Sequence, residues 1–295
     1  MKKILALTLA VAMSLSLAAC GGGNSGNASP ENGTPSGATS SAPQSGASSA
    51  QQPSGDFTTV EPGKLIMATN CAFPPYEMAA DGEGPYVGAD GVSYEGIDVE
   101  IAVALADKLG LELVIDDMEF TSALLAVQEN RADMTLAGLT YKADRDEVMD
   151  FSTSYAKGIQ VVIVADGSDI EELDDLEGKM IGTQEGTTGY AYASDTPENG
   201  GYGEKNVLAY ANGALAVEAL KNGQVDAVII DNGPAQAYVA ANTGLHILPA
   251  AWVEEDYCLA VDEGNSALLN ALNAELEAMI ADGTIQTIID KYITD

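Results

Sequence analysis

The chain of 295 residues carries 12 lysines and arginines against 45 aspartates and glutamates, so its formal charge is −33. Nucleic-acid binding needs clustered basic side chains, yet the chain has only two arginines, Arg131 and Arg145. One histidine and three cysteines offer too few ligands for a zinc site and too little for a Ser-His-Asp triad. We therefore exclude nucleic acid as a partner and expect neither a metal nor a cofactor. Because 46% of the residues are hydrophobic, a sizeable core is still expected.

Residues 1–19 have the pattern of an export signal peptide. Lys2 and Lys3 precede an apolar run over 4–19, which is shorter than the roughly 20 residues that span a bilayer. The run ends in LAAC (17–20), which is similar to a bacterial lipobox, whose cysteine is lipidated after cleavage. An ordinary cleavage site with an incidental cysteine is the alternative. We expect an extracytoplasmic protein that is lipid-anchored to the cell membrane through Cys20.

Residues 20–56 are predicted to form a disordered tether. The segment 21–56 holds eight glycines, nine serines and four prolines, with no Val, Ile, Leu, Met or aromatic residue. Such a segment cannot bury enough apolar surface to offset its ordering entropy. At about 5–6 Å times the square root of its length, it would reach roughly 30–36 Å from the membrane.

Strand and helix patterns alternate after residue 57. In chain order, they predict a strand over 64–70, a helix over 99–109, a strand over 111–115 and a helix over 121–130. This alternation indicates an α/β fold with mostly parallel sheets flanked by helices.

Two similar lobes are predicted from an internal repeat. Residues 125–138 align without gaps on residues 218–231, and each copy contains an aspartate, Asp133 or Asp226, before an apolar strand. Ligands of open α/β sheets bind beyond the carboxyl ends of the strands. We therefore expect Gly138, Thr140 and Asp231 to face a common cleft.

Extended apolar segments at 158–164 and 256–261 are interpreted as two connections between the lobes. The tail is predicted to form two amphipathic helices, over 266–279 and 285–292, that pack on the first lobe. These boundaries assign 57–157 with 256–295 to lobe 1 and 158–255 to lobe 2.

Arg145 is the leading candidate for binding an anion. It lies at the start of a predicted helix over 142–149, and a helix N-terminus favours negative charge. The alternative is a surface ion pair with Asp144, Asp146 or Asp150. A glycine-containing turn over 182–189, between a strand over 179–181 and a helix, offers backbone N–H groups to an anion or is a plain turn.

Asp231 ends an apolar strand, where its carboxylate can receive an ammonium group or cap the helix that starts near Pro234. Phe73 and Phe120 each follow a predicted strand and are either core residues or walls of the cleft. Cys71 and Cys258 are hypothesised to form a disulfide, with two buried thiols as the alternative.

Seven sequence blocks follow one another over 57–295: ATNCAFPPYE (68–77), GIDV (96–99), AGLT (137–140) with Arg145, DFS (150–152), DLEGK (175–179), GTTG (186–189) and VDAVIID (225–231). In this order they resemble the type II extracellular solute-binding proteins of ABC importers, in the family that binds polar amino acids (bacterial solute-binding protein family 3). The resemblance implies a two-lobed periplasmic-binding-protein-like fold with a two-stranded hinge.

The resemblance also implies roles for individual residues. The ligand α-carboxylate is expected at Arg145, Thr140 and the backbone of Thr187 and Thr188. The α-ammonium group is expected at Asp231 and at the carbonyl edge of Ala137 and Gly138. The ligand side chain is expected between Phe73 and Phe120, with Asn70 and Gln184 at its far end.

Two departures from the family pattern bear on the ligand. Lys142 stands where relatives often carry Thr, and Asn70 stands where relatives that take Lys or Arg often carry Asp. Asn70 with Gln184 favours a neutral polar ligand such as glutamine, while Glu185 keeps a basic ligand open. The segment 79–93 is longer than usual in the family and has no predicted role.

The sequence therefore predicts the extracytoplasmic substrate-binding component of an ABC importer. We expect a monomer, not an enzyme, that closes on a free polar L-amino acid and presents it to the permease subunits. One alternative is a lyase or dehydratase on the same fold, with Glu185 or Lys142 as its acid or base. Another is a sensor module that delivers ligand to a receptor.

Overall fold

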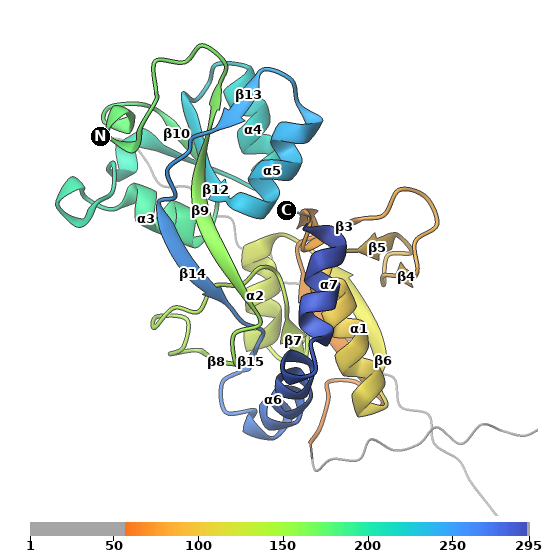
Figure 1. Cartoon of the computed structure of the whole chain (residues 1–295). Helices are drawn as coiled ribbons and strands as arrows, with labels where there is room; N and C mark the ends of the chain where they lie inside the picture. Colours follow the sequence, from red (N-terminus) through yellow and green to blue (C-terminus); the bar gives the residue numbers. More distant parts are fainter. Residues whose placement is uncertain (1–56, 294–295) are drawn as a thin grey trace, which may run out of the picture. The chain divides into compact units, whose positions relative to one another are not determined.

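The computed structural model describes residues 57–293 (Figure 1). The predicted export signal, Cys20 and the tether up to residue 56 lie outside the described residues. Within residues 57–293, no helix has both the length and the apolar character needed to cross a membrane.

The first lobe is built on a five-stranded mixed sheet. Its strand order is β6 (Glu112–Asp117), β1 (Lys64–Thr69), β7 (Met134–Thr135), β15 (Ala260–Asp262) and β8 (Met149–Phe151). β1 pairs in parallel with β6 and β7, whereas β15 pairs antiparallel with β7 and β8. The C-terminal part of the chain therefore returns to complete this sheet.

Four helices belong to the first lobe: α1 (Ile97–Leu109), α2 (Phe120–Gln128), α6 (Ser266–Ala281) and α7 (Thr284–Tyr292). Ile97, Ile101 and Leu105 recur at helical spacing along α1 and are fully buried. α1 ends at Gly110, whose φ of 70° gives a left-handed cap. α6 and α7 pack against α1 (Figure 1), which confirms the two predicted amphipathic tail helices.

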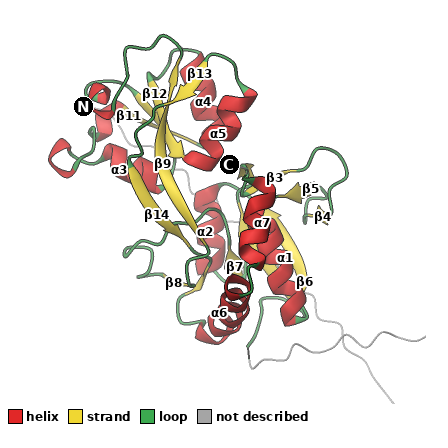
Figure 2. Cartoon of the chain, viewed as in Figure 1, coloured by secondary structure: helices red, strands yellow, loops and turns green. Residues whose placement is uncertain are grey.

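The second lobe is built on a six-stranded mixed sheet. Its main order is β11 (Val207–Tyr210), β10 (Ile181–Gln184), β12 (Ala227–Asp231), β9 (Ala156–Ala165) and β13 (Leu245–Ile247), and β14 (Val253–Tyr257) also pairs with β9. The helices are α3 (Thr188–Ser194), α4 (Gly213–Lys221) and α5 (Asn232–Ala241), with short 3₁₀ turns at Leu173–Leu176, Pro197–Asn199 and Glu204–Asn206 (Figure 2). The α/β fold class is thus confirmed. In each of these two sheets, three neighbouring strands at one side are parallel and the remaining pairings are antiparallel.

Two antiparallel strands connect the lobes. β9 and β14 pair from Gln160 opposite Val253 to Ala156 opposite Tyr257, and they run side by side in Figure 1. Gly158 lies against the Tyr257 ring so closely that a Cβ at this position would overlap it. The two-stranded hinge expected from the family resemblance is therefore present.

A third sheet was not predicted. It is four-stranded and antiparallel, in the order β2 (Ala72–Phe73), β3 (Glu77–Ala79), β5 (Ser93–Glu95) and β4 (Tyr86–Val87). Strands of two or three residues are too short to show a period-2 pattern in the sequence. The segment 79–93 thus contributes β4 and one end residue each of β3 and β5 to a small sheet beside the first lobe.

The internal repeat corresponds to equivalent structures in the two lobes. α2 and α4 end at aligned residues, Gln128 and Lys221, and β7 and β12 begin at aligned residues, Met134 and Ala227. Each repeat aspartate accepts a hydrogen bond from the start of the neighbouring strand. Asp133 accepts from the N–H groups of Val60 and Ile66, both at 2.7 Å, and Asp226 accepts from Met180 N–H at 2.8 Å.

Two sequence predictions of local structure are corrected. Residues 143–148 form turns rather than the predicted helix, because only Met149 of the segment 142–149 is buried and no apolar stripe holds a helix against the core. The strand predicted over 179–181 lies at Ile181–Gln184 instead.

The disulfide hypothesis is wrong, because Cys71 and Cys258 are both free thiols. Cys71 packs beside Tyr94 and Val99 in a small apolar cluster, whereas the N–H of Cys258 donates to Leu139 O at 2.9 Å in the returning strand segment. Burial raises the pKa of Cys258 to about 11 and raises the pKa of Cys71 further. Both cysteines are therefore unreactive thiols at neutral pH.

The repeat aspartates give a matched test of the fold. Asp133 is buried and satisfies two backbone N–H groups, whereas Asp226 is exposed and satisfies one. We expect Asp133→Ala to lower the free energy of unfolding by about 1–3 kcal/mol, because two donors lose their acceptor. Asp226→Ala should cost less than ~1 kcal/mol. Urea unfolding of both variants is the measurement, and a larger loss for Asp226→Ala would contradict this role.

Candidate functional site

A pocket lies between the two lobes and encloses about 340 Å³ of space, part of which is open to solvent. All eleven predicted ligand-binding residues line it, together with Glu77, for which no role was predicted. The lining residues are Asn70, Phe73, Glu77, Phe120, Ala137, Gly138, Thr140, Arg145, Gln184, Thr187, Thr188 and Asp231.

The segment after β7 forms one wall of the pocket. Gly138 has a φ of +52°, and a Cβ there would lie 2.5 Å from the Phe73 ring, so only glycine allows this close approach. Gly138 N–H donates to Asp98 Oδ2 at 2.8 Å. Tyr155 OH also donates to the Asp98 carboxylate, at 2.8 and 2.9 Å. Asp98, at the start of α1, therefore fixes the backbone that lines the pocket.

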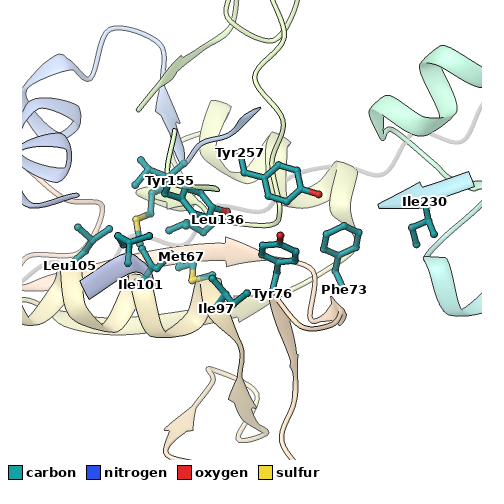
Figure 3. Close-up of a cluster of buried hydrophobic side chains, with 14 of the residues drawn as sticks. Met67, Phe73, Tyr76, Ile97, Ile101, Leu105, Leu136, Tyr155, Ile230 and Tyr257 are labelled. Carbon is teal, nitrogen blue, oxygen red and sulfur yellow. The ribbon is translucent and has the colours of Figure 1, made fainter. Parts of the chain in front are cut away.

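Aromatic side chains form the apolar part of the site. Phe73 and Phe120 are each 7% exposed, and Phe73 packs against Tyr76 with ring centroids 5.9 Å apart. Tyr76 meets Tyr257 edge to face at 5.1 Å. Figure 3 shows these three rings, Phe73, Tyr76 and Tyr257, at the end of the core cluster that faces Ile230 of β12. The two predicted alternatives for Phe73 and Phe120, core or wall, are both realised.

Arg145 places a cation at the pocket without a carboxylate partner. Its Nη1 donates to Thr140 O at 2.8 Å, its Nη2 donates to Gly186 O at 2.9 Å, and its guanidinium lies 5.6 Å from the Phe120 ring centroid. No ion pair among residues 57–293 includes Arg145. The predicted alternative of a surface ion pair is therefore wrong. Burial lowers the pKa of Arg145, yet arginine stays charged in proteins.

The turn between β10 and α3 forms the opposite wall. Thr187 caps α3, because its hydroxyl accepts from Tyr190 N–H at 3.2 Å. Gln184 Nε2 donates to Asn70 Oδ1 at 3.0 Å, and Asn70 Nδ2 donates to Met118 O at 2.8 Å. Gln184 Oε1 is buried and has no hydrogen-bond partner within residues 57–293. The pocket therefore holds a free acceptor beside Asn70.

Asp231 places a buried carboxylate on the second lobe. It occupies the N-cap position of α5, but its side chain makes no capping hydrogen bond. Instead its carboxylate accepts from Gln160 Nε2 at 2.8 Å and from the hydroxyl of Tyr257. The pKa of Asp231 is raised to about 7. Burial is the main cause and the nearby Glu255 adds to it, whereas the hydrogen bonds from Tyr257 and Gln160 act in the opposite direction.

The residues around Asp231 were missed by the sequence analysis. Gln160 lies on β9, whereas Glu255 and Tyr257 lie on β14, so the two hinge strands supply the surroundings of the carboxylate. Gln160 Nε2 also donates to Glu255 Oε2 at 2.9 Å, and Thr188 Oγ1 donates to the same oxygen at 3.0 Å. A glutamine inside the apolar run of residues 159–164 was the available signal.

Hydrogen bonds join the lobes around the pocket. Arg145 of the first lobe bonds to Gly186 of the second, and Gln184 of the second bonds to Asn70 of the first. Tyr238 OH on α5 donates to Ala72 O at 2.7 Å. The lobes are therefore in contact on more than one side of the site.

Within the described residues, no group of three or more His, Cys, Asp or Glu side chains has an arrangement suited to a metal ion. The site consists of one unpaired guanidinium, buried carboxyl groups, amides and aromatic rings.

Comparisons with known proteins agree with this geometry. Residues 65–295 match the bacterial extracellular solute-binding proteins, family 3. The chain belongs to this family. It is 29% identical to the arginine-binding extracellular protein ArtP of Bacillus subtilis, over all of this chain and 99% of that protein. It is 31% identical to the glutamine-binding protein GlnH of Bacillus subtilis, over 68% of this chain and 73% of GlnH.

A solved structure of an ancestral arginine-binding protein bound to glutamine has a TM-score of 0.70 and 34% identity to this chain. The match covers 80% of this chain and all of the ancestral protein. The two-lobed architecture of this family of solute-binding proteins is thus shared.

The raised pKa of Asp231 leads to a test of the ligand-free protein. The unfolded carboxylate ionises near pH 4 and the folded one near pH 7, so the stability that Asp231 contributes falls as the pH rises through this window. We expect Asp231→Asn to be more stable than the wild type at pH 8, by on the order of 2–4 kcal/mol, with no difference at pH 4.

Urea unfolding between pH 4 and pH 8 measures this difference, with the exposed Asp81→Asn as a control that should show none. An Asp231→Asn variant that is less stable than the wild type at pH 8 would contradict the buried, destabilising charge.

Proposed function

We propose that this chain is the extracytoplasmic substrate-binding component of an ABC importer and that it closes on a free polar L-amino acid. The observation that carries this proposal is the pair of Arg145 and Asp231, which line one pocket from opposite lobes without an ion-pair partner for Arg145 among residues 57–293. An amino-acid zwitterion has the complementary charges at its two α-substituents.

The α-carboxylate binds at Arg145 in this proposal. The guanidinium, already held by Thr140 O and Gly186 O, keeps further N–H donors for an anion. The hydroxyl of Thr140 and the N–H of Thr188 in the first turn of α3 add neutral donors. Arg145 is half-buried, and its partial removal from water increases the strength of its interaction with a carboxylate.

The α-ammonium group binds at Asp231 and at the carbonyl edge of Ala137 and Gly138. Neither Asp231 nor Glu255 forms an ion pair within the described residues, and an ammonium group would supply the missing cation. It would favour the ionised form of Asp231 and so lower its pKa from about 7. Ligand affinity should therefore weaken as the pH falls below neutrality, because Asp231 must lose its proton to bind the cation.

The ligand side chain lies between Phe73 and Phe120 and reaches Asn70 and Gln184. The free Gln184 Oε1 favours a side chain with an N–H donor. Glutamine fits the neutral Asn70 and Gln184 pair. The names of relatives that bind arginine or glutamine support both as first candidates for a screen. Glu185, which kept a basic ligand open, is exposed and does not line the pocket.

We also propose that the ligand is bound without chemical conversion. The lyase alternative needs an acid or base directed at the ligand, and its two sequence candidates, Glu185 and Lys142, are not among the lining residues. Lys142 pairs with Asp144 at 3.2 Å. Ligand recovered after incubation with the protein should therefore have an unchanged mass.

The lipid anchor at Cys20, the monomeric state and delivery to permease subunits are part of the same proposal. The LAAC sequence and the following glycine- and serine-rich segment support the anchor. Genes for a permease and an ATPase beside the gene of this chain would favour an importer over a sensor module.

Isothermal titration of three alanine variants tests the pocket assignment. Arg145→Ala and Asp231→Ala each remove one partner of a buried charge pair with the ligand, which costs about 2–5 kcal/mol. At roughly 1.4 kcal/mol per decade, affinity for the best amino acid should fall about 30-fold to several thousandfold. Arg131→Ala is the matched control, because Arg131 is exposed and pairs with Glu129 at 3.0 Å. Loss of binding in Arg131→Ala with retention in Arg145→Ala would overturn the assignment.

A further inference from the structure

Glu77 is a buried acid that lines the pocket and that none of the roles described above uses. It lies on β3, opposite Phe73 of β2, and its side chain is 0% exposed. Neither of its carboxyl oxygens has a hydrogen-bond donor among residues 57–293. A buried acceptor without a donor is costly, and here it borders an open ligand site.

The groups that face Glu77 come from every element around it. The acids are Asp98 of α1, Asp117 of β6 and Asp231 of β12, and no lysine or arginine of the described chain is among the charges that act on it. The tyrosines Tyr76, Tyr155 and Tyr238 and the thiol of Cys71 also feel its charge. Burial, followed by the charge of Asp98, raises the pKa of Glu77 well above its usual value.

Asp98 is the neighbouring acceptor for a proton on Glu77. The Asp98 carboxylate already accepts from Gly138 N–H and from the Tyr155 hydroxyl, both of which favour its ionised form. Burial raises the pKa of Asp98 to about 6, and the hydrogen bonds from Gly138, Tyr155 and Glu77 act against this effect. Two adjacent buried carboxyl groups cannot both ionise without a donor between them, so the pair holds one proton.

We propose that Glu77 is a specificity-determining residue of the pocket: its protonated carboxyl group donates to Asp98, and its carbonyl oxygen accepts from an N–H group on the ligand side chain. This inference rests on the proposed function. The α-ammonium group has Asp231, whereas Glu77 is the strand partner of Phe73, which is the expected wall for the ligand side chain. Paired residues of antiparallel strands share one face of the sheet, so Glu77 borders the same part of the pocket as Phe73. The ligand class is therefore an amino acid with a side-chain amide, guanidinium or other N–H donor.

Two substitutions test the proposed hydrogen bonds of Glu77 with Asp98 and with the ligand: the conservative E77Q and the apolar E77L. Glutamine reproduces a protonated glutamate, because its NH₂ donates to Asp98 and its carbonyl oxygen accepts from the ligand. Leucine has a similar size and neither group. Isothermal titration uses glutamine and arginine as N–H-bearing probes and methionine as an apolar probe of similar length.

For the N–H-bearing probe that binds best, we expect E77L to lower affinity about tenfold or more and E77Q about threefold at most. The preference of the wild type for that probe over methionine should shrink in E77L by the same factor. Glu112→Leu, an exposed acid at the start of β6, is the matched control and should bind as the wild type does. E77L with wild-type affinity, or E77Q with as large a loss as E77L, would overturn the proposal.

Thermal unfolding without ligand gives a readout that does not depend on the proposed function. The folded wild type must keep a proton on Glu77 that the unfolded chain releases above about pH 4.5, so its stability falls as the pH rises. The glutamine side chain introduced by E77Q needs no such proton, so this pH dependence is absent from the variant.

We expect E77Q to unfold at least about 2–4 °C above the wild type at pH 8, with the gap closing toward pH 5. A gap that is equal at both pH values would overturn the shared proton. If the wild type bound no amino acid, the proposed function would fail, while this pH dependence would still report on Glu77.

Discussion

The structure depends on one electrostatic constraint, which is a guanidinium on the first lobe and a carboxylate on the second that line one pocket and are not paired with each other. Arg145 has only carbonyl oxygens as partners in the described part of the chain, and Asp231 has only an amide and a hydroxyl. Asp231 is buried and Arg145 is half-buried, and charges removed from water without a counter-charge are unfavourable. A zwitterion bound between Arg145 and Asp231 supplies a counter-charge to each of them. Because it contacts both lobes, its binding favours the closed arrangement of the lobes.

The repeated α/β unit brings these two charges to one place. Aligned helices and strands in the two lobes end at the same side of their sheets, where Gly138 and Asp231 occupy equivalent positions. At the opposite end of the strands, Asp133 and Asp226 each accept a hydrogen bond from a backbone N–H group near the start of the adjacent strand. The strand ends that face the pocket are therefore left free for ligand.

The hinge is also part of the site. Gln160 and Tyr257, which hold the Asp231 carboxylate, lie on β9 and β14, the strands that connect the lobes. Gln160 also bonds to Glu255, which in turn accepts from Thr188 at the start of α3. One hydrogen-bond network thus links both ends of the proposed ligand to the strands that connect the lobes.

The sequence was sufficient to predict the fold and most of the pocket because both follow local rules. Strand ends, the repeat and the family blocks indicate residues at or shortly after the ends of strands. Asn70 directly follows β1, Asp231 ends β12 and Gly138 comes three residues after β7. Glu77 was missed because β3 is too short to show a pattern, and burial of an acid cannot be read from its neighbours in the chain.

The errors have similar physical causes. One of the two reasons for placing Arg145 at the pocket was wrong, since residues 143–148 form turns and no helix N-terminus is present in that described segment. Gln160 and Glu255 are far apart in the chain and meet only through the pairing of β9 with β14. The pairing of Cys71 with Cys258 rested on chain position alone, and the two thiols are free.

The most direct measurement is calorimetric titration of the best-binding amino acid beside two of its derivatives, the α-carboxamide and the Nα-acetyl form. Each derivative keeps the side chain and removes one charge of the zwitterion. If the ligand bridges Arg145 and Asp231, the free amino acid binds and both derivatives lose about 30-fold or more in affinity. Binding of either derivative with the affinity of the free amino acid would contradict the bridging of the two lobes by the ligand charges.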